Sequence, residues 1–205
     1  MTEVDQDAIE QVVTKIKRQA KYYWSDSSRH RTGRLDLPKA RTEIIEAALR
    51  DINYLDLGCA ALIAAEYGAV RDLLVTPFPG AVETIQQIKT MDIHIALLTN
   101  GATIPQREKI NRFALGSLFE HIFIEEEFGI GKPDPAIYRH VMNIFGVSPE
   151  ETWMVGDNYE WEVVAPQKLG MKGIWVNHKG GDASASLPVQ PYRSIGALTD
   201  LLQLL

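Results

Sequence analysis

The chain has 205 residues, of which 45% are hydrophobic and 23% charged, which is ordinary globular usage and argues against disorder. Its formal net charge of −6 excludes a global basic field, so nucleic acid is a poor candidate partner. The single cysteine, Cys59, excludes an intramolecular disulfide framework and fits a reducing compartment. We recognise neither a secretory signal nor an apolar run long enough to span a bilayer, and we expect a cytoplasmic protein without membrane contacts.

The first third of the chain reads as a succession of helices. From residue 7 onward, apolar residues recur at helical spacing, as at Ile9, Val12 and Ile16. Pro38 opens a second helix, and a third covers about residues 57–74. The polar stretch SDSSRHRTGRLD between the first two is expected to be a loop. We therefore predict a helical domain over residues 1–76.

After the turn at TPFPG the pattern changes to strands that alternate with helices. The expected strands are IHIALL, HIFIE, TWMVG and GIWVN, and the expected helices are AVETIQQIKT, PQREKINRFAL, PDPAIYRHVMNIF, EWEVVAPQKLG and IGALTDLLQLL. Alternation at this length predicts right-handed crossovers and a parallel sheet. The predicted fold class is α/β, with a Rossmann-like parallel sheet covered by helices on both faces over residues 77–205.

Three polar clusters lie near the ends of expected strands, and in an open parallel sheet ligands bind at the carboxyl ends of strands. The first cluster, directly after IHIALL, is Thr99, Asn100 and Gly101. The second is GKPDP, which contains Lys132 and lies between a strand and a helix. The third is GDN, which contains Asp157 and is followed by Glu162. We expect all three clusters to face one crevice.

These residues together suit a phosphorylated substrate. Thr99 and the backbone N–H groups of the turn after it can donate hydrogen bonds to phosphate oxygens. Lys132 can neutralise the charge of the phosphoryl group. Asp157 offers an oxygen ligand for Mg²⁺, and Glu162 can hold a metal-bound water or brace Lys132. Each cluster alone also has a structural interpretation: TNG as a turn, GKPDP as a stiff loop, and DN as a helix cap.

Taken in order, LLTNG, GKPDPAIY and MVGDNYEWEV resemble the second, third and fourth motifs of the haloacid dehalogenase superfamily. The helices before PFPGAVETI resemble the small cap domain of the family's subclass I. The resemblance implies a Mg²⁺-dependent phosphatase that acts on a small phosphorylated metabolite through an aspartyl-phosphate. It assigns phosphate binding to Thr99, Asn100 and Gly101, charge neutralisation to Lys132, and metal binding to Asp157. Glu162 stands where many members carry an aspartate, and the resemblance implies a position for it outside the metal's direct ligands.

Asp5 and Asp7 in MTEVDQDAIE have the spacing of the family's first motif, D-x-D-x-T or D-x-D-x-V, whose first aspartate attacks phosphorus. In the family this motif ends a buried central strand, which should be a continuous apolar run. Only four residues precede Asp5, and two of them are polar. Asp7 followed by Glu10 resembles a helix capping box. We therefore expect this segment to be the connector to the cap, with the first core strand and its nucleophile absent.

Three functions stay open at this point. The first is the phosphatase, whose activity in this chain is in question because the nucleophile strand is missing. The second is a phosphate-ligand binding or regulatory protein that retains Thr99, Lys132 and Asp157 without turnover. The third is a haloacid dehalogenase, although Asp157 as a metal ligand favours phosphate chemistry because dehalogenation needs no metal. The sequence predicts neither the substrate nor the oligomeric state.

Overall fold

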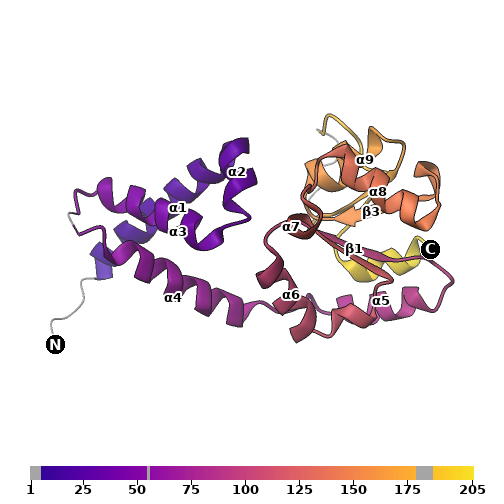
Figure 1. The fold of residues 1–205 in the computed structure, drawn as a ribbon, viewed down its shortest axis with the longest axis horizontal. Coiled ribbons are helices and arrows are strands. Elements are labelled where there is room, and N and C mark those ends of the chain that lie inside the picture. Colours follow the sequence, from indigo (N-terminus) through magenta and orange to yellow (C-terminus); the bar gives the residue numbers. More distant parts are fainter. Residues whose placement is uncertain (1–5, 55, 179–186) are drawn as a thin grey trace. The chain divides into compact units, whose positions relative to one another are not determined.

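The structure is a computed structural model that describes residues 6–54, 56–178 and 187–205 (Figure 1). The chain divides into two units, Met1–Thr76 and Pro77–Leu205. The described part of the first unit is helical, whereas the second unit combines strands with helices. No helix within these described ranges is long and apolar enough to cross a membrane.

Four helices make up the described part of the N-terminal unit: α1 (Gln6–Ser25), α2 (Ser27–Gly33), α3 (Leu37–Arg50) and α4 (Cys59–Leu74). Apolar residues three and four positions apart lie on one side of each helix and form a stripe. The stripes pack against one another and are removed from water. Ile45 and Leu49 of α3 pack against Ala60 and Ala64 of α4. The alanines are small, so the two helices can approach closely there.

The stretch SDSSRHRTGRLD was predicted as a loop, and this prediction is wrong because it contains α2. The carboxylate of Asp26 accepts a hydrogen bond from the N–H of Arg29 at 2.8 Å and so caps the helix. Gly33 at its end is buried, and a Cβ built there would lie 2.9 Å from the Tyr23 ring. The residue types that cap helices are also common in loops, so composition alone does not reveal a helix of this length.

The C-terminal unit alternates strands and helices. Its described strands are β1 (Ala96–Thr99), β2 (His121–Ile124), β3 (Trp153–Gly156), β4 (Lys172–Val176) and β5 (Arg193–Ile195). Its α-helices are α5 (Ala81–Lys89), α6 (Thr103–Arg112), α7 (Glu125–Phe128), α8 (Pro135–Phe145) and α9 (Ala165–Gln167). A π-helix covers Glu160–Val164, and 3₁₀ turns cover Leu115–Ser117, Pro149–Glu151 and Leu198–Gln203. Every described strand pair is parallel, so the predicted α/β class is confirmed.

The described strands form two sheets, one of β1 and β2 and one of β3, β4 and β5 in that order. Both sheets lie between the same two layers of helices (Figure 1). On one face, Ile88 of α5 belongs to a core cluster that also includes Val155 of β3 and Ile95, the residue directly before β1. On the other face, Met142 of α8 lies in a cluster that also includes Leu98 of β1 and Met154 of β3. The two sheets are therefore halves of one layered α/β arrangement.

The end of the chain differs from its predicted form. Arg193–Ile195 forms β5, which is too short to show a strand pattern in the sequence. The final stretch IGALTDLLQLL, predicted as a helix, forms the tighter 3₁₀ turn over Leu198–Gln203. The carboxylate of Asp200 accepts hydrogen bonds from the N–H groups of Gly196 at 3.0 Å and Ala197 at 3.1 Å, which fixes the start of this turn.

Candidate active site

Lys132 joins the three polar clusters that the sequence placed at strand ends. Asn100, directly after β1, donates from Nδ2 to the carbonyl oxygen of Lys132 at 2.7 Å and accepts from its N–H through Oδ1 at 2.8 Å. The Lys132 ammonium donates to Oε1 of Glu162 at 2.7 Å. Because Asn100 follows β1 and Glu162 lies in the π-helix after β3, both strands point their carboxyl ends at Lys132.

Lys132 and Glu162 form a buried ion pair, with side chains only 10% and 3% exposed. Burial raises the pKa of Glu162, and the neighbouring charge of Asp157 raises it further, although the Lys132 ammonium pulls it down. The second carboxylate oxygen, Oε2, is buried without a hydrogen-bond partner in the described part of the chain. The pair holds the ammonium in one position, which is what a fixed positive charge in a binding site requires.

Two glycines make this close arrangement possible. A Cβ built on Gly131 would lie 2.5 Å from Cδ of Glu125 and 2.7 Å from Oδ1 of Asn100. A Cβ built on Gly156 would lie 2.5 Å from Cγ of Glu162. Separations below 3.0 Å are not tolerated between such atoms, so any side chain at either position would displace a residue of the site.

Sequence reasoning missed two residues that hold the turn after β1. Glu125, only 5% exposed, accepts a hydrogen bond from the N–H of Gly101 at 2.8 Å. Gln106 of α6 donates from Nε2 to the carbonyl oxygen of Asn100 at 2.7 Å. Glu125 comes directly after β2, and this strand-end position was the signal that could have identified it. Gln106 lies inside a helix and had no such signal.

The predicted site residues fall into two groups in the structure. The side chain of Asn100 and the N–H of Gly101 bind protein atoms, so here they position the turn and Lys132. Thr99 is half-buried at the end of β1, and Asp157 is exposed after β3, where its carbonyl oxygen accepts from Nε1 of Trp175 at 3.0 Å. Thr99, Lys132 and Asp157 therefore stay the predicted residues for side-chain contact with a ligand.

The described residues supply only part of a magnesium site. They contain no group of three or more His, Cys, Asp or Glu side chains arranged to hold a metal ion. Mg²⁺ takes six oxygen ligands and commonly uses one or two carboxylates together with water and substrate phosphate. Asp157 fits the role of such a carboxylate. Glu162 is paired with Lys132, and its unpartnered Oε2 can accept a hydrogen bond from a nearby water.

The structure describes one of the two N-terminal aspartates. Asp5 lies outside the described residues. Asp7 lies in the first turn of α1, in the N-terminal unit, where its side chain is exposed. No D-x-D pair follows a strand in the described part of the chain, so a carboxylate that attacks phosphorus is not visible at the site.

A family model described as haloacid dehalogenase-like hydrolase matches residues 3–170. The chain belongs to this family. The match covers the turn after β1, the loop with Lys132 and the π-helix with Glu162, so the motif resemblance seen in the sequence is confirmed.

Curated relatives of this haloacid dehalogenase-like hydrolase are named as phosphatases. A glyceraldehyde 3-phosphate phosphatase of Pyrococcus furiosus is 33% identical over 76% of this chain and 63% of its own length. A phosphoserine phosphatase of Thermus thermophilus is 36% identical over 58% of this chain and 49% of its own. An N-acylneuraminate-9-phosphatase of Rattus norvegicus is 35% identical over 56% and 46%. The chain thus spans less than two thirds of the length of each.

Solved structures share the fold of this chain. The magnesium-bound HAD-hydrolase YfnB of Bacillus subtilis matches with a TM-score of 0.74 and 20% identity, over 98% of this chain and 83% of that one. A dehalogenase matches with a TM-score of 0.68 and 23% identity, over 99% and 86%. At these identities the likeness concerns the fold, and it agrees with the layered α/β arrangement described above.

Proposed function

We propose that this chain carries the phosphate and metal site of a Mg²⁺-dependent phosphatase that acts on small phosphate monoesters. The observation that carries the proposal is the buried Lys132, held between Asn100 and Glu162 at the carboxyl ends of β1 and β3. The names of these three relatives refer to substrates that differ in their organic part but share a phosphate group. We therefore take the phosphate monoester as the common substrate class and leave the organic part open.

Each side chain has a separate part in this proposal. The Lys132 ammonium neutralises negative charge on the phosphoryl oxygens, and Glu162 keeps the ammonium in place. The Thr99 hydroxyl donates a hydrogen bond to a phosphoryl oxygen. A bound Mg²⁺ would add positive charge at the same group, with Asp157 as a protein ligand. Residues 1–76 would act as the cap domain, and a cytoplasmic location, expected from Cys59, stays a prediction.

Turnover through an aspartyl-phosphate requires a nucleophilic aspartate beside Thr99 and Lys132. The described residues have no D-x-D pair at a strand end, and the carboxylates of Glu162 and Glu125 are hydrogen-bonded to Lys132 and Gly101. We propose that hydrolysis depends on an aspartate brought there by a segment outside these residues. A phosphatase assay tests this with para-nitrophenyl phosphate and Mg²⁺ on two proteins. One is the chain itself, and the other is the chain extended at its N-terminus by an apolar strand that ends in D-x-D.

We expect the extended protein to hydrolyse para-nitrophenyl phosphate. This activity should be lost when Mg²⁺ is chelated, when Lys132 is replaced by Met, or when the first added aspartate is replaced by asparagine. Circular dichroism would verify that each variant is folded. Activity in neither of the two parent proteins, with both folded, would contradict the phosphatase proposal.

A second candidate is a phosphate-binding or regulatory protein without turnover, favoured by the absence of a D-x-D pair at a strand end in the described residues. It predicts that the unmodified chain binds inorganic phosphate in the presence of Mg²⁺ and hydrolyses nothing. Titration calorimetry that detects no heat with phosphate and Mg²⁺ would remove this candidate.

A further inference from the structure

The π-helix Glu160–Val164, which carries Glu162, has a wider turn than an α-helix, and Pro166 accounts for this turn. In an α-helix the N–H of residue 166 would donate to the carbonyl oxygen of Glu162, but proline has no N–H and its ring collides with that carbonyl group. In a π-helix each N–H donates to the carbonyl oxygen five residues earlier. The N–H of Ala165 follows this pattern and donates to the carbonyl oxygen of Glu160.

The Tyr138 hydroxyl donates a hydrogen bond at the next step of the same pattern. That step would join the N–H of residue 166 to the carbonyl oxygen of Trp161, and Pro166 cannot donate this bond. The Tyr138 hydroxyl donates to the Trp161 carbonyl oxygen at 2.6 Å. Main-chain carbonyl groups that are shielded from water need a donor. Tyr138 of α8 therefore stabilises the π-helix at the step where the proline has no N–H to offer.

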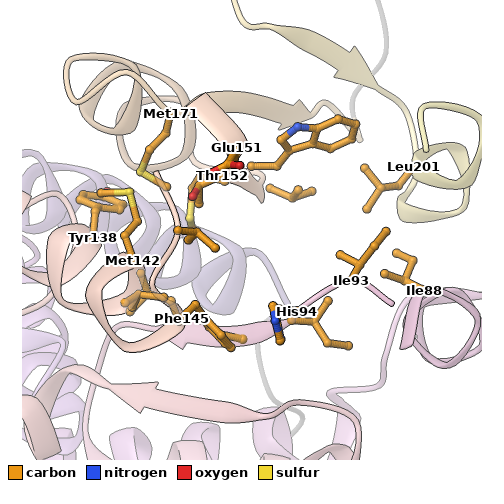
Figure 2. Close-up of a pocket in the computed structure, with 18 of the residues that line it drawn as sticks. Ile88, Ile93, His94, Tyr138, Met142, Phe145, Glu151, Thr152, Met171 and Leu201 are labelled. Carbon is orange, nitrogen blue, oxygen red and sulfur yellow. The ribbon is translucent and has the colours of Figure 1, made fainter. Parts of the chain in front are cut away.

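The packing around its ring fixes Tyr138 in position. The residue is 1% exposed and lies in a core cluster with Ile137, Met142 and Met171. Figure 2 shows Tyr138 beside Met142 and Met171. Burial raises the pKa of the Tyr138 phenol, and the negative charge of Glu162 raises it further, so the hydroxyl keeps its proton and stays a donor.

Two bonds join the start of α8 to the π-helix. Lys132 belongs to the loop that leads into α8, which begins at Pro135, and Tyr138 lies in the first turn of α8. Trp161 and Glu162 are neighbours in the π-helix. The hydrogen bond of Tyr138 to Trp161 and the ion pair of Lys132 with Glu162 therefore connect the same two segments. A shift of the π-helix against α8 would disturb both bonds.

A contact with β4 also holds the π-helix. A Cβ built on Gly173 would lie 2.7 Å from the carbonyl oxygen of Glu162 and 2.8 Å from Cα of Val163. Glycine at this position therefore lets the main chain of the π-helix approach β4 closely. Replacing Tyr138 by phenylalanine leaves this contact in place, so we expect the variant to fold.

We propose that Tyr138 is a positioning residue, whose hydroxyl fixes the π-helix that holds Glu162 against Lys132 and thereby fixes the Lys132 ammonium. Tyr138 acts through Trp161 and Glu162 and not by contact with a ligand. The inference concerns the position of Lys132 in the free protein, so it does not depend on phosphate binding or on turnover.

The test is NMR of the Lys132 ammonium in the full chain with isotope-labelled lysine, because a buried ion pair slows the exchange of ammonium protons with water. The signal is assigned by its loss in Lys132→Met. Tyr138→Phe removes the hydroxyl and keeps the ring. The matched control is Thr84→Val in α5, which removes a buried hydroxyl that donates to the carbonyl oxygen of Gly80 at 2.8 Å.

We expect Tyr138→Phe to speed exchange of the Lys132 ammonium protons at least about tenfold, and Thr84→Val to change it by less than about twofold. An unchanged rate in folded Tyr138→Phe would overturn the proposal. Equal effects of the two variants would also overturn it, because the hydroxyl would then contribute only to general stability. A wild-type ammonium that exchanges too fast to give a signal would show that Lys132 is not held, with the same consequence.

Pro166→Ala gives a second test, because it returns an N–H to residue 166. This N–H can donate in place of the Tyr138 hydroxyl, so in the Pro166→Ala background Tyr138→Phe should change the Lys132 exchange rate by less than about threefold. Equal effects of Tyr138→Phe in both backgrounds would contradict the proposal. Should Tyr138→Phe alone fail to fold, folding of the double variant would support the proposal, and unfolding of both would overturn it.

Discussion

The ion pair of Lys132 and Glu162 combines a structural and a chemical role in two side chains. A buried pair is weak evidence for stability, because both charges lose their hydration, but breaking it leaves one charge unpaired. The sequence left two roles open for Glu162, and the structure shows that it braces Lys132 at 2.7 Å. Whether Glu162 reaches Lys132 depends on the distance between residues 30 positions apart, and sequence spacing does not give that distance.

Lys132→Met is expected to lower the free energy of unfolding by about 3–5 kcal/mol, because the buried carboxylate of Glu162 loses its partner. Urea denaturation measures this. The double variant Lys132→Met/Glu162→Leu removes both charges and should recover most of the loss. A double variant as unstable as the single one would show that the loss comes from packing and not from an unpaired charge.

The raised pKa of Glu162 predicts how stability changes with pH. The folded protein holds this proton more tightly than the unfolded chain, so the contribution of Glu162 to stability is highest below about pH 4.5 and is lost as pH rises toward the folded pKa. Exposed carboxylates with lowered pKa values, such as Asp51 and Glu127, give the opposite slope. Comparison with Glu162→Gln isolates the Glu162 contribution.

In urea denaturation at a series of pH values above 4.5, the stability of the wild type should therefore fall relative to that of Glu162→Gln. Parallel pH profiles for the two proteins would contradict the assignment of a raised pKa to this carboxylate.

Gly131→Ala should destabilise the protein by about 1–3 kcal/mol, because its Cβ would collide with Glu125 and Asn100. Gly116→Ala is the matched control, since the nearest atom to its Cβ is 3.9 Å away, and it should change stability by less than about 0.5 kcal/mol. Thermal denaturation of both variants provides the comparison. Equal melting temperatures would mean that the turn holding Lys132 adapts without loss.

At the scale of elements, sequence patterns predicted the longer helices and the buried strands better than the short elements. α8 begins at Pro135 as expected, because proline at a first helical position and a long apolar stripe are strong local signals. α2 and β5 were missed, because their formation depends on one capping carboxylate and on pairing with β4, respectively. Glu125 was missed for a related reason, since its bond to Gly101 joins two elements.

Within the described residues, β1 has a ladder partner only in β2 and β3 only in β4, which leads to a prediction at the same scale. The amides of Leu98 and Val155 should exchange faster than those of Leu97 and Met154, whose main-chain groups point to β2 and β4. Each fast amide thus has a slow neighbour as its internal control, and NMR-detected exchange gives all four rates. Equal protection within each pair would show that the other edges of β1 and β3 already have partners.

For the C-terminal unit as a whole, β1 and β3 both line a cavity of about 410 Å³ (Figure 2). The fold class was predictable from alternating strands and helices. The division into two sheets was not, because strand pairing depends on contacts between segments that are far apart in the sequence.

The central claim is that Thr99, Lys132 and Asp157 belong to one site for an anion and its cation. Titration of the isotope-labelled chain with inorganic phosphate at saturating Mg²⁺, followed by amide NMR, tests it most directly. The account predicts that the amide signals of these three residues shift together with a single dissociation constant, and that Lys132→Met abolishes the shifts. Signals that stay unchanged, or that respond at different phosphate concentrations, would contradict it.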